Sequence, residues 1–131
     1  ICTKELVTTK GIRSLSPKSG GYTPMYVGRQ ENRDQAYHQG TAWPWLMGFY
    51  LEAYLRVYKM SGVNYIERRL IGFEEELYYH CVGTIPELFD GNPPFHGRGA
   101  ISFAMNVSGI LRAIRLIEKQ RAAEEAAEAE E

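Results

Sequence analysis

The sequence contains little cysteine, no long apolar run and no excess of charge of either sign. Its two cysteines, Cys2 and Cys81, are too few for a disulfide framework in 131 residues and fit a reducing compartment, where thiols are buried and inert. No stretch approaches the roughly 18 to 20 apolar residues that a membrane-spanning helix needs, and no signal peptide opens the chain. We therefore expect a cytoplasmic protein without a membrane partner.

The charge pattern argues against nucleic acid as a partner. The 15 Lys and Arg residues are balanced by 16 Asp and Glu residues, for a formal net charge of -1. The last eleven residues (121–131) carry one Arg and five Glu, so the remainder is mildly basic but has no basic stripe. Nucleic-acid binding requires clustered Lys and Arg, so the nine tyrosines do not indicate it by themselves.

The sequence shows no recognisable cofactor motif. The three His and two Cys residues lack the spacing of zinc ligands. Asp90 and Asn92 lie in a segment that is a turn by composition and lacks the regular spacing of a calcium loop. A phosphate-binding Gly loop and a nucleophile elbow are also missing from the sequence. We expect neither a metal nor another cofactor.

The sequence instead has the composition of one folded domain, with 44% hydrophobic and 12% aromatic residues. Residues 1–32 look irregular, apart from a short strand or turn within 6–15. Apolar periodicity predicts three helices, over about 41–60, 64–81 and 99–120. The Glu/Ala-rich tail, 121–131, should continue the last helix into solvent and fray.

The apolar faces of these helices suggest how they are arranged. The first helix is apolar nearly all round, with stripes at Leu46, Phe49, Ala53 and Val57 and at Leu51, Tyr54, Leu55 and Tyr58, so we expect burial on more than one side. The second has a single stripe: Ile66, Leu70, Phe73 and Leu77. In the third, we expect these residues to face inward: Ile101, Ala104, Val107, Leu111, Ile114 and Ile117.

A buried helix next to a half-exposed one is typical of the inner and outer helices of a toroid of αα-hairpins. Three helices cannot close such a ring, so we expect the missing partners in other chains or in further sequence. The start at Ile1 rather than Met favours a piece of a longer protein.

The run 33–55 is the most informative part of the sequence: RDQAYHQGTAWPWLMGFYLEAYL. Polar side chains and indole rings alternate there, before and at the start of the predicted apolar helix. A sugar site needs such groups, because hydroxyls take directional hydrogen bonds and a pyranose face stacks on an aromatic ring. The candidate sugar-binding residues are Asp34, Tyr37, His38, Gln39 and Trp43. The alternative is structural: the polar side chains satisfy backbone groups at the helix entry, and both indoles are core.

A second unusual run, GTIPELFDGNPPF, places the carboxylate of Glu87 among Gly and Pro residues. Glycoside hydrolysis usually requires two carboxyl groups, roughly 6.5–9.5 Å apart in inverting enzymes. A carboxylate on a constrained loop is suitably held for one of these two roles. The alternative is that Glu87 caps a turn or pairs with an Arg.

The strings GIRSLSP, RDQAYHQGTAWPW and GTIPELFDG, in this order, closely resemble the carboxy-terminal part of the glycogen debranching enzyme family. More narrowly, they resemble its amylo-α-1,6-glucosidase domain of the bacterial and archaeal kind, over roughly residues 6–117. The resemblance implies an all-α fold, about one third of an (α/α)6 toroid of αα-hairpins with long active-site loops. Residues 1–120 would be the carboxy-terminal portion of that domain, and 121–131 a tail.

The resemblance also implies an activity. The family removes the α-1,6-linked glucose at branch stubs of an α-glucan (glycogen or limit dextrin), with inversion. Glu87 would be the general base that activates water, and Tyr37, His38, Gln39 and Trp43 would line the glucose pocket. The family's general acid is an Asp in an earlier helix, and no segment here matches its setting. We therefore expect the isolated chain to be inactive.

Two other hypotheses remain open. The chain could be a non-catalytic helical module that binds glycan or a partner protein through the exposed aromatic residues at the start of its first helix. It could also be a purely structural piece that associates with itself through the apolar 44–60 helix.

Overall fold

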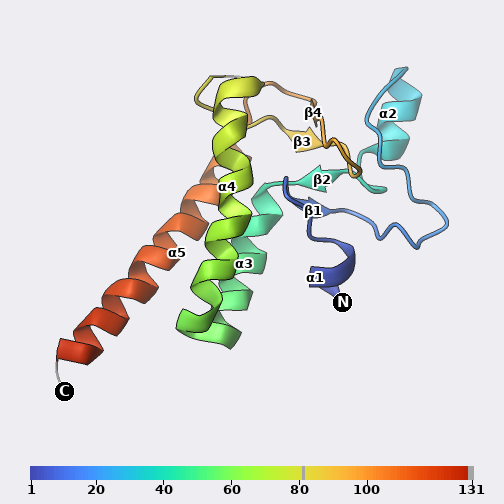
Figure 1. Ribbon diagram of the computed structural model, residues 1–131. Helices are drawn as coiled ribbons and strands as arrows, with labels where there is room; N and C mark the ends of the chain where they lie inside the picture. Colours follow the sequence, from blue (N-terminus) through green and yellow to red (C-terminus); the bar gives the residue numbers. More distant parts are fainter. Residues whose placement is uncertain (81, 130–131) are drawn as a thin grey trace.

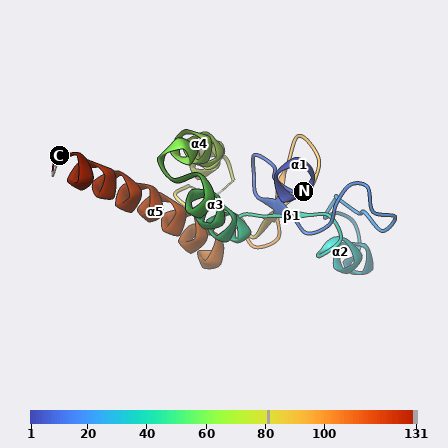
Figure 2. The same cartoon turned by 90° about the horizontal axis from the view of Figure 1, so that it is seen from below.

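The computed structural model describes residues 1–80 and 82–129, so Cys81 and the last two residues of the predicted tail lie outside it. Figure 1 shows the long helices α3 (Trp45–Tyr58), α4 (Val63–Tyr79) and α5 (Ala104–Ala129) gathered together, with a small sheet beside the amino-terminal end of α3. In the view of Figure 2, α2 (Gln30–Ala36) lies on the far side of β1 (Ile12–Arg13) from α5. The elements are α1 (Cys2–Glu5), β1 (Ile12–Arg13), α2 (Gln30–Ala36), β2 (Ala42–Trp43), α3 (Trp45–Tyr58), the 3-10 helix η1 (Lys59–Gly62), α4 (Val63–Tyr79), β3 (Leu88–Phe89), β4 (Gly97–Arg98) and α5 (Ala104–Ala129).

The sheet corrects the all-α prediction. Its four strands are antiparallel in the order β1-β2-β3-β4, and β1 falls inside the segment 6–15, where the sequence predicts a short strand or turn. Each strand has two residues, which is too short for a period-two pattern to be visible in the sequence. Because Ala42 of β2 pairs with Phe89 of β3, the run 33–55 is brought beside the loop that carries Glu87.

The first long helix, α3, begins later than its predicted start near residue 41. Trp43 lies in β2 instead of on the helix, and the Thr41 hydroxyl donates to the carbonyl of Tyr37 at 2.8 Å. The first helical amide, that of Trp45, donates to the side chain of Asn106 at 3.0 Å. A residue 61 positions away therefore caps α3, which no local sequence pattern could reveal.

The prediction that α3 is buried on more than one side is wrong within the described residues. Met47 and Leu51 are fully buried, whereas Phe49 and Val57 on the other face are 58% and 72% exposed. The reason is that α5, η1 and Tyr65 of α4 pack against the same half of α3. On the other half, the Arg112 guanidinium lies over the Phe49 ring at 5.6 Å from its centroid, and the stripe stays largely exposed among the described residues.

The second helix is amphipathic as predicted. Ile66 and Phe73 of α4 are buried, and Leu70 and Leu77 pack against the same core. The third helix, α5, begins at Ala104, later than its predicted start near residue 99, but it continues into the Glu/Ala-rich segment as far as Ala129, as the sequence predicts. Among the helices of the described residues, none combines the length and the apolar character needed to cross a bilayer.

The buried face of α5 differs from the predicted one. Ile117 is buried and Val107 packs against the core as predicted. Ile101, Leu111 and Ile114 are exposed, however, and Asn106, Ile110 and Ala113 are buried in their place. Two glycines explain this difference. A Cβ on Gly48 would lie 2.6 Å from the carbonyl oxygen of Gly109, so the missing side chains allow α3 and α5 to cross closely. This crossing fixes which face of α5 meets the core.

Candidate functional site

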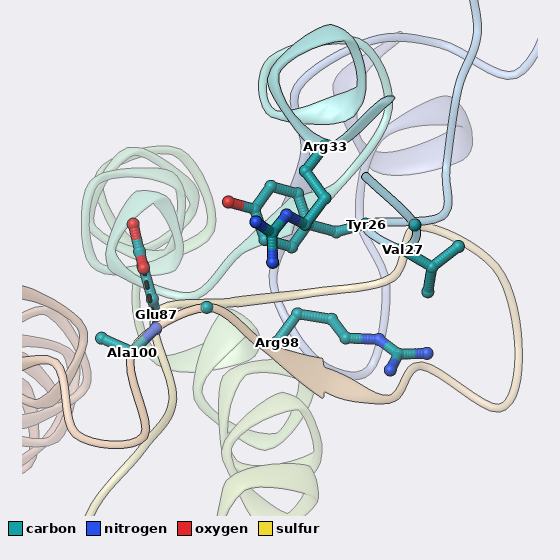
Figure 3. Close-up of a pocket in the computed structure, with 8 residues that line it drawn as sticks. Tyr26, Val27, Arg33, Glu87, Arg98 and Ala100 are labelled. Carbon is teal, nitrogen blue, oxygen red and sulfur yellow. Dashed lines mark hydrogen bonds between the residues drawn. The ribbon is translucent and has the colours of Figure 1, made fainter. Parts of the chain in front are cut away.

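Glu87 lies at the edge of an open cleft of about 580 Å³. Figure 3 shows the cleft between α2, the segment before α2, and the chain around β4. The residues that line it are Tyr26, Val27, Gly28, Arg33, Glu87, Arg98, Gly99 and Ala100. The only carboxylate among these lining residues, within the part of the chain that the structure describes, is that of Glu87.

The carboxylate of Glu87 is held at both oxygens. Its Oε1 accepts a hydrogen bond from the Tyr37 hydroxyl, and its Oε2 accepts one from the backbone amide of Ala100 at 2.8 Å. In residues 1–80 and 82–129, no ion pair involves Glu87. The predicted alternative of pairing with an Arg is therefore not found, although the contact with Ala100 resembles the other alternative, a turn cap.

Because Gly99 has no side chain, there is room beside it for the carboxylate of Glu87. The φ of Gly99 is +73°, a conformation that favours glycine, and a Cβ at this position would collide with the carboxylate oxygen of Glu87. The backbone of Glu87 in turn donates to the carbonyl of Ala100 at 2.9 Å. Backbone and side chain of Glu87 are thus both fixed to the segment that follows β4.

Asn106 holds the same loop in place by hydrogen bonds, and this residue was not singled out from the sequence. Its side-chain amide is fully buried and donates to the carbonyls of Pro86 at 2.5 Å and Glu87 at 2.6 Å, while its oxygen accepts from Trp45. The sequence does contain an indication that Asn106 is buried, because it lies four residues before Ile110 and therefore on the same apolar face of the helix. A polar residue in such a position must find partners in the core.

Tyr37 is packed in an aromatic cluster behind the carboxylate. Its ring meets the rings of His38 and Trp43 edge-on, at centroid distances of 4.6 and 4.8 Å. Burial raises the pKa of the Tyr37 phenol to about 12, and the hydrogen bond to Glu87 and the negative charge of Glu87 add to the effect. The hydroxyl therefore stays protonated at neutral pH and can act as a donor to Glu87.

The five predicted sugar-binding residues are placed differently from one another, and none of them is among those that line the cleft. Tyr37 alone of the five bonds to Glu87. Trp43 is 5% exposed, and His38 stacks over its ring at 5.5 Å. Asp34, His38 and Gln39 have exposed side chains. The structure thus brings Tyr37, His38 and Trp43 together behind Glu87 and leaves Asp34 and Gln39 outside this group.

Three cleft residues were not singled out from the sequence: Tyr26, Arg33 and Arg98. Arg33 is the first residue of the RDQAYHQG string, and in Figure 3 its side chain reaches from α2 towards Tyr26. Arg98 forms an ion pair with the buried carboxylate of Asp90 at 2.8 Å. Asp90 also accepts from the backbone amide of Tyr26 at 2.9 Å, so it joins two walls of the cleft.

Within the part of the chain that the structure describes, no three His, Cys, Asp or Glu side chains are grouped so that they could hold a metal ion. The site therefore consists of one carboxylate, two guanidinium groups and an aromatic cluster.

Comparisons with known proteins agree with the resemblance seen in the sequence. A family model described as amylo-alpha-1,6-glucosidase matches residues 1–112. A stretch of 50 residues is 38% identical to part of a protein called glycogen debranching enzyme from Saccharomyces cerevisiae (strain ATCC 204508 / S288c), which covers 34% of this chain. The match spans about 3% of the length of that relative.

Proposed function

Because the chain belongs to the amylo-alpha-1,6-glucosidase family, we propose that it forms part of a glycoside hydrolase active site in which Glu87 is the general base. The proposed reaction is hydrolysis of the α-1,6-linked glucose at branch stubs of an α-glucan, with inversion at the anomeric carbon. Residues 1–120 would form the carboxy-terminal portion of an (α/α)6 toroid, and 121–131 a tail. The observation that carries the proposal is the carboxylate of Glu87, held by two donors at the edge of an open cleft.

The geometry suits a base that takes a proton from water. A carboxylate offers about four acceptor positions, and the Tyr37 hydroxyl and the Ala100 amide occupy two of them. A further position is available for a water molecule in the cleft. Since no ion pair in the described residues involves Glu87, no cation there competes with the water for the carboxylate. A fixed orientation of the base contributes to catalysis because the reacting atoms are already aligned.

Of the residues predicted from the sequence, the exposed Asp34, His38 and Gln39 would contact the glucose. Tyr37 and the buried Trp43 would instead support Glu87. The cleft adds Arg33 and Tyr26 as further candidates. A guanidinium group presents its donors in a planar fork, which suits neighbouring hydroxyls, and an aromatic face suits the apolar side of a sugar ring.

The second carboxyl group must come from outside these residues. Asp90 is 1% exposed and paired with Arg98, so it cannot protonate a leaving group, and Asp34 does not line the cleft. We propose that other segments of the toroid supply the general acid and cover the exposed stripe of Phe49 and Val57 on α3. The isolated 131-residue chain would then have no hydrolase activity.

The single carboxylate at the cleft also favours a second candidate function, a non-catalytic module that binds glycan. Such a module would bind maltooligosaccharides with an affinity that does not change when Glu87 is replaced by Gln. The base proposal requires hydrolysis, so the two functions are separated by product formation and not by binding.

The test is the release of glucose from a limit dextrin that carries single-glucose branch stubs. The native polypeptide containing this sequence should release glucose, and residues 1–131 alone should release none. Linear maltooligosaccharides serve as the control substrate and should yield little. If the native polypeptide binds the dextrin but releases no glucose, the hydrolase proposal fails and the binding module replaces it.

A further inference from the structure

We propose that Tyr37 is a positioning residue, whose hydroxyl fixes the orientation of the Glu87 carboxylate. This inference rests on the proposed function of Glu87 as the base. In this role Tyr37 does not contact the sugar, which differs from the role that the sequence suggests. Thr41 and Trp43 would then both act by holding Tyr37 in place.

The first argument is the geometry at the carboxylate. The Tyr37 hydroxyl donates to Oε1 and the Ala100 amide to Oε2, so the two oxygens are tied to opposite sides of the site. A carboxylate held at one oxygen can still rotate about its terminal bond, whereas one held at both cannot. The Ala100 donor belongs to the backbone, so Tyr37 is the member of the pair that a side-chain substitution can remove.

The second argument is that Tyr37 is itself held by its own sequence motif. The Trp43 indole donates to the Thr41 hydroxyl at 3.1 Å, and that hydroxyl donates to the carbonyl of Tyr37 at 2.8 Å. The Trp43 ring then meets the Tyr37 ring edge-on at 4.8 Å. These three contacts connect Tyr37, Thr41 and Trp43 to one another within the string YHQGTAW. Both the backbone and the ring of Tyr37 are therefore fixed.

The third argument is chemical. A neutral phenol can only help an ionised carboxylate if it keeps its proton, and burial raises the pKa of Tyr37 to about 12. Hydrogen bonds to charged groups are stronger than those between neutral groups, so the contact holds the Glu87 carboxylate firmly in its orientation. When water transfers its proton to Glu87, Tyr37 keeps its own proton and acts only through the base.

The experiment compares Tyr37→Phe with the wild type in the native polypeptide, on the branched dextrin. The variant keeps the ring and its packing but loses the donor. We expect kcat to fall about 10- to 100-fold, as for the loss of a hydrogen bond to a charged group. KM should stay within about twofold of the wild type.

Tyr50→Phe is the matched control. The Tyr50 hydroxyl bonds to those of Thr3 and Tyr65, both far along the chain from Glu87, so its loss should leave kcat and KM unchanged. Should Tyr37→Phe fold poorly, 3-fluorotyrosine at position 37 keeps the hydroxyl and makes it a stronger donor. Because the donor to Glu87 is kept, kcat should then stay close to that of the wild type.

The inference is overturned if Tyr37→Phe leaves both kcat and KM unchanged. It is also overturned if KM rises while kcat stays the same, because that split assigns Tyr37 to sugar binding. Failure of the proposed function itself is recognised separately, by wild-type hydrolysis in Glu87→Gln.

Discussion

Glu87→Gln in the native polypeptide lowers kcat on branched dextrin by about 10³-fold, within the range expected for the loss of a general base. The amide has the size of the carboxylate but cannot take a proton from water. Its oxygen can still accept from the Ala100 amide, and the Tyr37 hydroxyl can turn to accept from the new amide group. The loop is therefore expected to stay folded, with KM within about threefold of the wild type.

Glu75→Gln provides the control for this experiment. Glu75 is an exposed residue of α4, so the same chemical change should leave kcat unaffected there. Initial rates of glucose release at saturating dextrin give kcat for both variants. A Glu87→Gln enzyme within threefold of the wild type would show that another group activates water, and the assignment of Glu87 would be withdrawn.

Asn106→Ala destabilises the fold by about 3 to 5 kcal/mol, the second large effect that we expect. Three backbone groups lose their partner at once, namely the Trp45 amide and the carbonyls of Pro86 and Glu87. Each unsatisfied buried group costs about 1 to 3 kcal/mol, and the costs are not fully additive. The measurement is the free energy of unfolding of the native polypeptide from urea titration.

Asn64→Ala is the control for Asn106, since Asn64 is exposed in the first turn of α4. Its effect should stay within about 0.5 kcal/mol. Residual activity gives a second readout, because the Glu87 loop rests on Asn106 and kcat of Asn106→Ala should fall as well. A loss of stability below about 1 kcal/mol would mean that the loop keeps its place without this amide.

Much of the helical part of the fold could be predicted from the sequence. The stripe of α4 is regular, and Ile66 and Phe73 are buried as their spacing indicates. The Glu/Ala-rich segment continues α5 because its residues are strong helix formers. These predictions succeed because periodicity and propensity are local properties of the chain.

The sheet and the helix crossing could not be predicted in this way. Two-residue strands leave no periodic trace, and the pairing of Ala42 with Phe89 joins segments far apart in the sequence. The face that α5 buries is decided by Gly48 and Gly109, which matter only because they meet. The cap of α3 by Asn106 likewise depends on a tertiary contact.

The candidate site shows the same limit. Composition identified Glu87 and the aromatic run, because a carboxylate in a constrained loop and indoles beside polar groups are unusual in sequence. It could not separate a residue that touches sugar from one that supports the base, since the same side chains do both. Only the contacts of Tyr37 with Glu87 and Trp43 distinguish the two roles.

The central claim is that Glu87 directs a water molecule onto an α-linked glucose, and the anomer of the released sugar tests it most directly. Proton NMR during the first minutes of hydrolysis of a branched dextrin by the native polypeptide separates β-glucose from α-glucose before they interconvert. Direct attack of water with a general base inverts the anomeric carbon, so β-glucose should appear first. Initial release of α-glucose would indicate a covalent intermediate and would contradict the role of Glu87 as a base that activates water.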